Sequence, residues 1–150
     1  MGELRHIVVV GASLGGLRAA ETVRSEGFDG TITVIGDEPH APYDRPPLSK
    51  QVLQGEWEPE RTALPAGGDE SLDLRWEQGV AATGLDVAER QVALADGRTV
   101  PFDGLIIATG ASARPLPGAP DLEGLHTLRT LDAVSYTHLR AHETSLHPVC

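Results

Sequence analysis

The chain has 150 residues, of which 40% are hydrophobic and 23% charged, a composition typical of one globular domain with a sizeable core. Its formal net charge of −10 argues against nucleic acid and anionic membranes as partners, because both require a basic face. No apolar run approaches the roughly 18 residues of a membrane span, and no signal-peptide pattern opens the chain, so we expect a cytoplasmic protein.

The chain opens with the pattern of a strand, a glycine turn, a helix and a second strand. Residues 6–10 (HIVVV) are typical of a buried parallel strand, and Gly11-Ala-Ser-Leu-Gly-Gly16 follows them directly. Gly27 is a typical helix stop, and residues 31–35 (TITVI) predict the second strand. Because the turn opens a helix, unpaired backbone N–H groups there favour the pyrophosphate of a dinucleotide. Apolar residues at helical spacing are expected to pack on the sheet: Leu14, Leu17, Ala20 and Val23.

Two positions modify this expected nucleotide site. Ser13 replaces the middle glycine of G-x-G-x-x-G, which adds a Cβ near the pyrophosphate but supplies a hydroxyl donor for a phosphate oxygen. Asp37 lies 21 positions after Gly16, close to the roughly 20-residue offset of a carboxylate that bonds a ribose hydroxyl. Its charge argues against a 2′-phosphate at this site. The alternative interpretation is a tight strand-to-helix turn that binds no ligand.

The middle of the chain predicts mostly loops. Residues 39–48 contain four prolines and predict a structured loop, followed by a short helix at about residues 49–53. Residues 54–71 are polar, with glycine and proline, and predict a surface excursion in which Trp57 packs locally.

The pattern of apolar residues changes at residue 72. Short apolar segments, with a hairpin signal at Asp96-Gly97, predict a β-meander. Residues 103–110 (DGLIIATG) predict another buried strand that runs into a glycine. The expected fold is α/β: an incomplete Rossmann-like domain over residues 1–110, with a parallel sheet and a β-meander insertion. The meander segments are residues 72–74, 80–82, 85–87, 91–94 and 99–100.

The last part of the chain divides into a linker and a tail of different character. Three prolines mark residues 111–133 as a linker. Histidines spaced by four and five in residues 134–150 would suit a metal site on a helix. We favour a non-native tail, from a cloning junction, a frameshift or read-through, because nothing supplies outer partners for metal ligands. The histidines are His138, His142 and His147.

Four blocks occur in an order that resembles a known enzyme family. They are residues 11–16 (GASLGG), 36–38 (GDE), 42–50 (PYDRPPLSK) and 105–115 (LIIATGASARP). The chain is similar, from residue 5 to about 133, to the FAD-dependent NAD(P)H reductases of ferredoxins and rubredoxins. That group includes putidaredoxin-reductase-like enzymes and the reductase components of Rieske dioxygenase and P450 systems. The one cysteine, Cys150, leaves no redox cysteine pair, which separates the chain from disulfide reductases.

The resemblance implies a set of FAD contacts and neither a metal site nor a separate catalytic residue. The pyrophosphate would be held by Gly11, Ala12, Ser13, Gly15 and Gly16. The adenosine ribose would be bound by Asp37, together with Glu38. Beside the pyrophosphate and isoalloxazine would lie Arg45, Pro46 and Lys50, with Lys50 stabilising negative charge on the reduced ring. The remaining contacts would be Ala82, through its backbone to adenine, and Ala108, Thr109 and Gly110. The alternatives are a surface ion pair for Arg45 and Lys50, and a capped strand end for Thr109-Gly110.

The resemblance also implies a function for the whole protein. Hydride would pass from NAD(P)H to FAD, and single electrons to a ferredoxin or rubredoxin in an oxygenase or P450 chain. Relatives continue past the equivalent of Asp132 into a second G-x-G-x-x-G for NAD(P)H, so we expect an N-terminal fragment that is inactive alone. One alternative is a stand-alone nucleotide-binding module, or a non-functional truncation product without enzyme activity. Another is an NAD-binding dehydrogenase domain, against which the β-meander and the residues 44–50 (DRPPLSK) argue.

Overall fold

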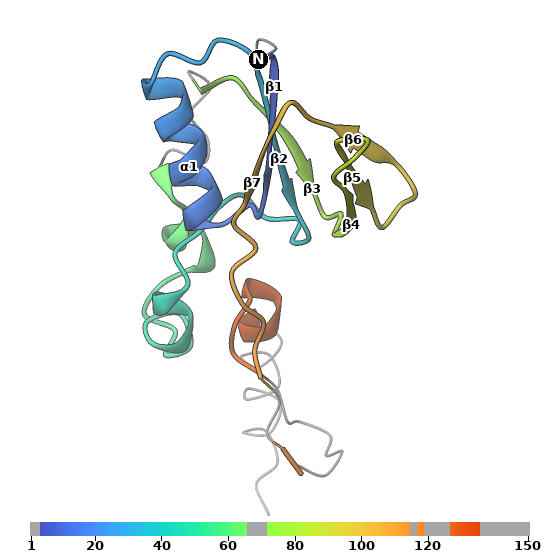
Figure 1. Ribbon diagram of the computed structural model, residues 1–150. Helices are drawn as coiled ribbons and strands as arrows, with labels where there is room; N and C mark the ends of the chain where they lie inside the picture. Colours follow the sequence, from blue (N-terminus) through green and yellow to red (C-terminus); the bar gives the residue numbers. More distant parts are fainter. Residues whose placement is uncertain (1–3, 66–71, 115–116, 119–126, 136–150) are drawn as a thin grey trace, which may run out of the picture. The chain divides into compact units, whose positions relative to one another are not determined.

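The computed structural model describes residues 4–65, 72–114, 117–118 and 127–135 (Figure 1). The chain divides into two compact units, each of which is described by itself. The first unit comprises Met1–Tyr43 and Ala63–Gly110, and the second comprises Asp44–Thr62 and Ala111–Cys150.

A four-stranded parallel sheet in the order β3-β2-β1-β7 forms the centre of the first unit. The helix α1 (Leu14–Ser25) connects β1 to β2 and begins directly after the glycine turn, as predicted. Parallel neighbours joined by a crossover helix confirm the predicted Rossmann-like α/β fold. The strands are β1 (His6–Val10), β2 (Thr31–Gly36), β3 (Leu74–Gln78) and β7 (Gly104–Ile107).

Side chains on β1 and β2 alternate between the two faces of the sheet, and α1 packs on one of them. Leu17 of α1 is fully buried, as the helical spacing predicts, but Leu14 is 45% exposed. The prediction that Leu14 packs on the sheet is therefore wrong, because this first helical residue lies beside the glycine turn rather than over the strands. The buried residues on the α1 face include Ile7, Val9, Ala20, Ile32 and Val34.

An antiparallel sheet in the order β4-β5-β6 covers the face opposite α1 (Figure 1). Its strands are β4 (Ala82–Asp86), β5 (Gln91–Leu94) and β6 (Thr99–Pro101). Gly97 has a φ of +87° between β5 and β6, and its N–H donates to the Leu94 carbonyl at 3.1 Å. The predicted hairpin and meander are confirmed for these three strands. The core on this face contains Val8, Ile35, Val80, Val92 and Leu94.

Two of the strand predictions are wrong in detail. Leu74, expected in the meander, belongs to β3, which pairs in parallel with β2. Leu74 and Trp76 pack on the α1 side of the sheet, so their spacing identified a strand but not its partner. The strand expected over residues 103–110 is shorter, and Ile107 is 65% exposed. Ile107 is the last residue of β7, which among the described strands pairs with β1 alone.

The second unit contains short helical turns. Two of them are the 3₁₀-helices η1 (Pro46–Ser49) and η2 (Pro59–Thr62). The helix expected at about residues 49–53 is therefore misplaced, because prolines fix the φ of a first helical turn and start it earlier. Trp57 packs locally, as predicted, with the Arg61 guanidinium carbon 4.4 Å from its ring centre.

Parts of the linker and tail predictions lie outside the described residues. They include residues 119–126 of the linker and residues 136–150, with the three tail histidines. Within the part that the structure describes, no group of three His, Cys, Asp or Glu side chains is placed to hold a metal ion. A search of the same residues found no helix long and apolar enough to cross a membrane.

Candidate dinucleotide-binding site

The ends of β1 and β2 meet the start of β4 around a cavity of about 220 Å³. In open α/β sheets ligands bind at the carboxyl ends of the strands, so this cavity lies where a dinucleotide is expected. Four lining residues are predicted cofactor contacts: Gly11, Asp37, Ala82 and Thr109. The lining also includes Val10, Ile35, Gly36 and Ala81.

Gly11 is the point at which the ends of three parallel strands come together. Its N–H donates to the Ile35 carbonyl at 2.8 Å, while the Ala108 N–H donates to the Val10 carbonyl at 2.7 Å. Gly11 has a φ of +121°, and a Cβ at this position would lie 2.1 Å from the Ala108 carbonyl oxygen. Glycine is therefore required here by both conformation and space, and Ala108 lies directly against the turn.

The start of α1 presents backbone N–H groups that make no hydrogen bond within the helix. The first helical bond runs from the Leu17 N–H to the Ser13 carbonyl at 3.0 Å, so the preceding N–H groups have no partner within the helix. Ser13 occupies the capping position, but its hydroxyl makes no capping hydrogen bond, and the first turn contains no acidic residue. The hydroxyl and the N–H groups together can bind an anion such as a pyrophosphate.

The other predicted residues of the turn differ in how tightly they pack. A Cβ on Gly16 would lie 1.8 Å from the Gly11 carbonyl oxygen, so α1 and the turn touch directly. The Ala12 methyl lies against Gly36, where a Cβ would approach it to 2.4 Å. Gly15 is exposed, and a Cβ there would have an ordinary contact of 3.9 Å with the Ala108 methyl. The packing of the described residues therefore does not require glycine at position 15.

The two acidic residues after β2 have different surroundings. Asp37 is exposed and lines the cavity, as a ribose contact would. Glu38 is half-buried and outside the cavity lining, and its carboxylate accepts a hydrogen bond from the hydroxyl of buried Tyr43. The structure therefore brings Asp37, and not Glu38, together with Gly11 and Thr109.

Three further predicted contacts stand at the ends of strands. Ala82 is the first residue of β4 and is half-buried. Thr109 and Gly110 follow β7 and are exposed, and Gly110 has a φ of +69°. Gly36 and Tyr43 were not among the predicted contacts, although Gly36 directly precedes the predicted acid and Tyr43 opens the Y-x-R-P-P-L-S-K block. Their positions next to the predicted acid and at the start of this block are the sequence features that could have identified them.

Arg45, Pro46 and Lys50 belong to the second unit. Arg45 is half-buried, and its guanidinium donates to the Arg129 carbonyl at 2.8 Å. Pro46 is the first residue of η1, and Lys50 follows its end with an exposed side chain. The contacts of these three residues with a cofactor stay predictions.

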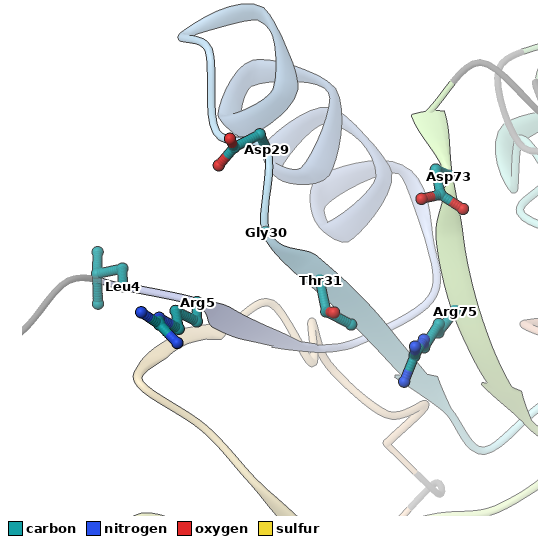
Figure 2. A pocket seen from close by; sticks show the side chains of 7 residues that line it. All are labelled: Leu4, Arg5, Asp29, Gly30, Thr31, Asp73 and Arg75. Carbon is teal, nitrogen blue, oxygen red and sulfur yellow. The ribbon is translucent and has the colours of Figure 1, made fainter.

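A larger cavity, of about 490 Å³, lies at the opposite end of the parallel strands. Figure 2 shows that its lining comes from the segments at the starts of β1, β2 and β3, with charges of both signs on Arg5, Arg75, Asp29 and Asp73. It has neither a glycine turn nor a helix N-terminus, so it lacks the features of a dinucleotide site. Close by, burial and then the charge of Arg75 lower the pKa of His6.

The comparisons with known proteins agree with this geometry. The chlorobenzene dioxygenase ferredoxin reductase component of Cupriavidus sp. (strain PS12) is 43% identical over 133 residues, which is 86% of this chain and 32% of that protein. Rhodocoxin reductase of Rhodococcus erythropolis is 42% identical over 144 residues, 93% of this chain and 34% of that protein. The chain thus spans about a third of the length of these curated relatives.

Solved structures show the same fold. Putidaredoxin reductase, in its covalent complex with putidaredoxin, superposes with a TM-score of 0.80 at 30% identity, over 91% of this chain and 34% of that one. The resemblance to ferredoxin reductases is confirmed. The family model described as "Pyridine nucleotide-disulphide oxidoreductase" matches residues 5–147, and the chain therefore belongs to that family.

Proposed function

We propose that this chain forms the FAD-binding portion of a reductase that passes electrons from NAD(P)H through FAD to a ferredoxin or rubredoxin. The observation that carries the proposal is the cavity in which Gly11, two positions before the helix cap Ser13, lies together with Asp37. Several relatives carry the names of ferredoxin reductase components of dioxygenase systems. An oxygenase or P450 electron-transfer chain is therefore the setting that we propose.

The residues around the cavity fit the adenosine and pyrophosphate parts of FAD. The Ser13 hydroxyl and the first N–H groups of α1 would bind the pyrophosphate, and Asp37 would accept hydrogen bonds from the ribose. Ala82 would meet adenine through its backbone. Complete small-molecule sites span roughly 300–1,000 Å³, so a cavity of about 220 Å³ accommodates only part of the cofactor.

FAD, when bound, links a two-electron hydride donor to a one-electron iron–sulfur carrier. The residues of this chain would bind and orient the cofactor. Arg45 and Lys50 would supply positive charge beside the pyrophosphate and the isoalloxazine, and Thr109 would pack against the cofactor. These 150 residues contain no pair of thiols, because their one cysteine is Cys150.

The chain spans about a third of its relatives' length, so we propose that the NAD(P)H site and the acceptor's docking surface come from sequence outside it. The isolated chain should then show no NADH-to-ferricyanide turnover, and robust turnover would contradict this. We place the whole protein in the cytoplasm, where reduced nicotinamide is regenerated.

A titration of the purified chain tests the cofactor assignment. We expect saturable binding of one FAD per chain, followed by flavin fluorescence, and we expect NAD at equal concentration not to displace it. A chain that is folded by circular dichroism but binds no FAD would overturn the proposal. Preferential binding of NAD would instead favour a dehydrogenase domain.

We also propose that residues 134–150 are not native to the reductase, on the gathering of three histidines in that segment, although the family match extends to residue 147. Sequencing the source DNA beyond the Ala133 codon tests this. An open frame leading into a strand, a G-x-G-x-x-G turn and a helix would support the proposal. A stop codon directly after Cys150 would contradict it, and the three tail histidines would then need a function.

A further inference from the structure

The loop that carries Asp37 is anchored along its length. The Gly79 N–H donates at 3.1 Å to the carbonyl of Glu38, the residue directly after Asp37. Further along, the Gln78 side-chain amide donates to the His40 carbonyl at 3.0 Å. The end of β3 and the residues after it therefore fix the backbone on the far side of Asp37.

Tyr43 adds a side-chain anchor to the same loop. It is 5% exposed, and an isolated antiparallel bridge joins it to Ala63. Its ring meets the His40 ring edge-on, with the ring centres 6.4 Å apart. These contacts fix the direction of the phenol, whose hydroxyl donates to the Glu38 carboxylate.

We propose that Tyr43 and Glu38 are a positioning pair that sets Asp37 as the one carboxylate presented to the ribose of a bound dinucleotide. The inference rests on the proposed FAD function. Glu38 is held by its backbone carbonyl and by its side chain, while no hydrogen bond within the described residues involves the Asp37 carboxylate. The adjacent acids therefore have separate roles. Asp37 contacts the ligand, and Glu38 affects ligand binding only by positioning the loop that carries Asp37.

The affinity of the full 150-residue chain for FAD tests this division of roles. Asp37→Asn should weaken FAD binding by about 10-fold or more, because a hydrogen bond to a charged group is lost. Tyr43→Phe and Glu38→Ala should each weaken it by a similar, smaller factor of roughly 5-fold, and the double variant by no more. Glu38→Gln should recover most of the loss, because its amide oxygen can still accept from the phenol.

The decisive comparison combines Tyr43→Phe with Asp37→Asn. If Tyr43 acts through Asp37, Tyr43→Phe should have no further effect on FAD affinity in the Asp37→Asn chain. A merely structural tyrosine would weaken binding in both backgrounds alike. Asp29→Asn, an exposed acid at the opposite end of the strands, is the matched control and should bind FAD like the parent.

The outcomes separate this inference from the proposed function. Failure of the unsubstituted, folded chain to bind FAD would overturn both. Binding by that chain with no loss in Asp37→Asn would overturn the positioning inference alone. The same holds if Glu38→Gln weakens binding as much as Asp37→Asn, since Glu38 would then be a direct ligand.

Discussion

Asp103 and His6 are joined by two hydrogen bonds in opposite directions. The Asp103 carboxylate accepts from the His6 N–H at 2.8 Å, and the Asp103 N–H donates to the His6 carbonyl at 2.8 Å. The same carboxylate oxygen accepts from the Arg5 N–H at 2.9 Å. These bonds align β7 with β1 just before their parallel pairing begins at Ile7 and Gly104.

The Asp103 bonds predict a component of acid sensitivity. The N–H donors of Arg5 and His6 lower the pKa of Asp103, so its stabilisation is present above the unfolded pKa of about 4 and is lost as pH falls through the folded value. Asp103→Asn should therefore lower the melting temperature at neutral pH. On acidification, the melting temperature of this variant should fall less than that of the parent chain. Thermal unfolding by circular dichroism, between about pH 2 and about pH 7, measures this. Acid profiles that run parallel would contradict it.

His6 predicts a second pH dependence, in a higher range. Burial and Arg75 lower its pKa while Asp103 opposes them, and its Nε2 lies 2.8 Å from the Thr33 hydroxyl. The unfolded state therefore binds more protons just below its own pKa of about 6.5, and stability falls as pH drops through that range. His6→Gln should remove this component. Melting temperatures at about pH 7 and about pH 5 should then differ less than in the parent chain.

The glycine turn gives a matched pair of stability predictions. Gly16→Ala places a Cβ 1.8 Å from the Gly11 carbonyl oxygen, so the turn must shift and the free energy of unfolding should fall by roughly 1–3 kcal/mol. Gly15→Ala meets an ordinary contact of 3.9 Å and should raise it by about 0.5–1 kcal/mol, because alanine favours a helix. Urea unfolding of the two variants tests the contrast. Equal effects would show that the turn relaxes around a methyl group.

Local patterns in the sequence predicted the first half of the sheet well. The strand at His6–Val10 matches its prediction because a buried parallel strand reads as a continuous apolar run. The turn at Gly97 could be predicted because the dipeptide Asp-Gly favours tight hairpin turns. In contrast, Leu74 was assigned to the wrong sheet, since a strand's partner depends on contacts remote in the sequence.

The candidate site was predictable by position but not by role. The spacing from Gly16 identified Asp37, which follows β2 and lines the cavity. It could not separate Asp37 from Glu38, because the separation depends on Tyr43, whose hydroxyl reaches back across the loop. The misplaced helix near residue 49 has a local cause, since Pro46 and Pro47 favour the first positions of a helix.

Arg24 is predicted to contribute more to stability than any surface ion pair of α1. Its guanidinium donates to the carbonyls of Phe28 and Gly30, both at 2.7 Å, and of Leu72 at 2.8 Å, so it ties α1 to the segments entering β2 and β3. Arg24→Ala leaves these part-buried acceptors unpaired and should lower the free energy of unfolding by roughly 2–3 kcal/mol. Arg18→Ala, on the same helix, loses an exposed pair with Glu21 and should cost less than about 0.5 kcal/mol. Urea unfolding compares them, and similar losses would show that water replaces Arg24 at those carbonyls.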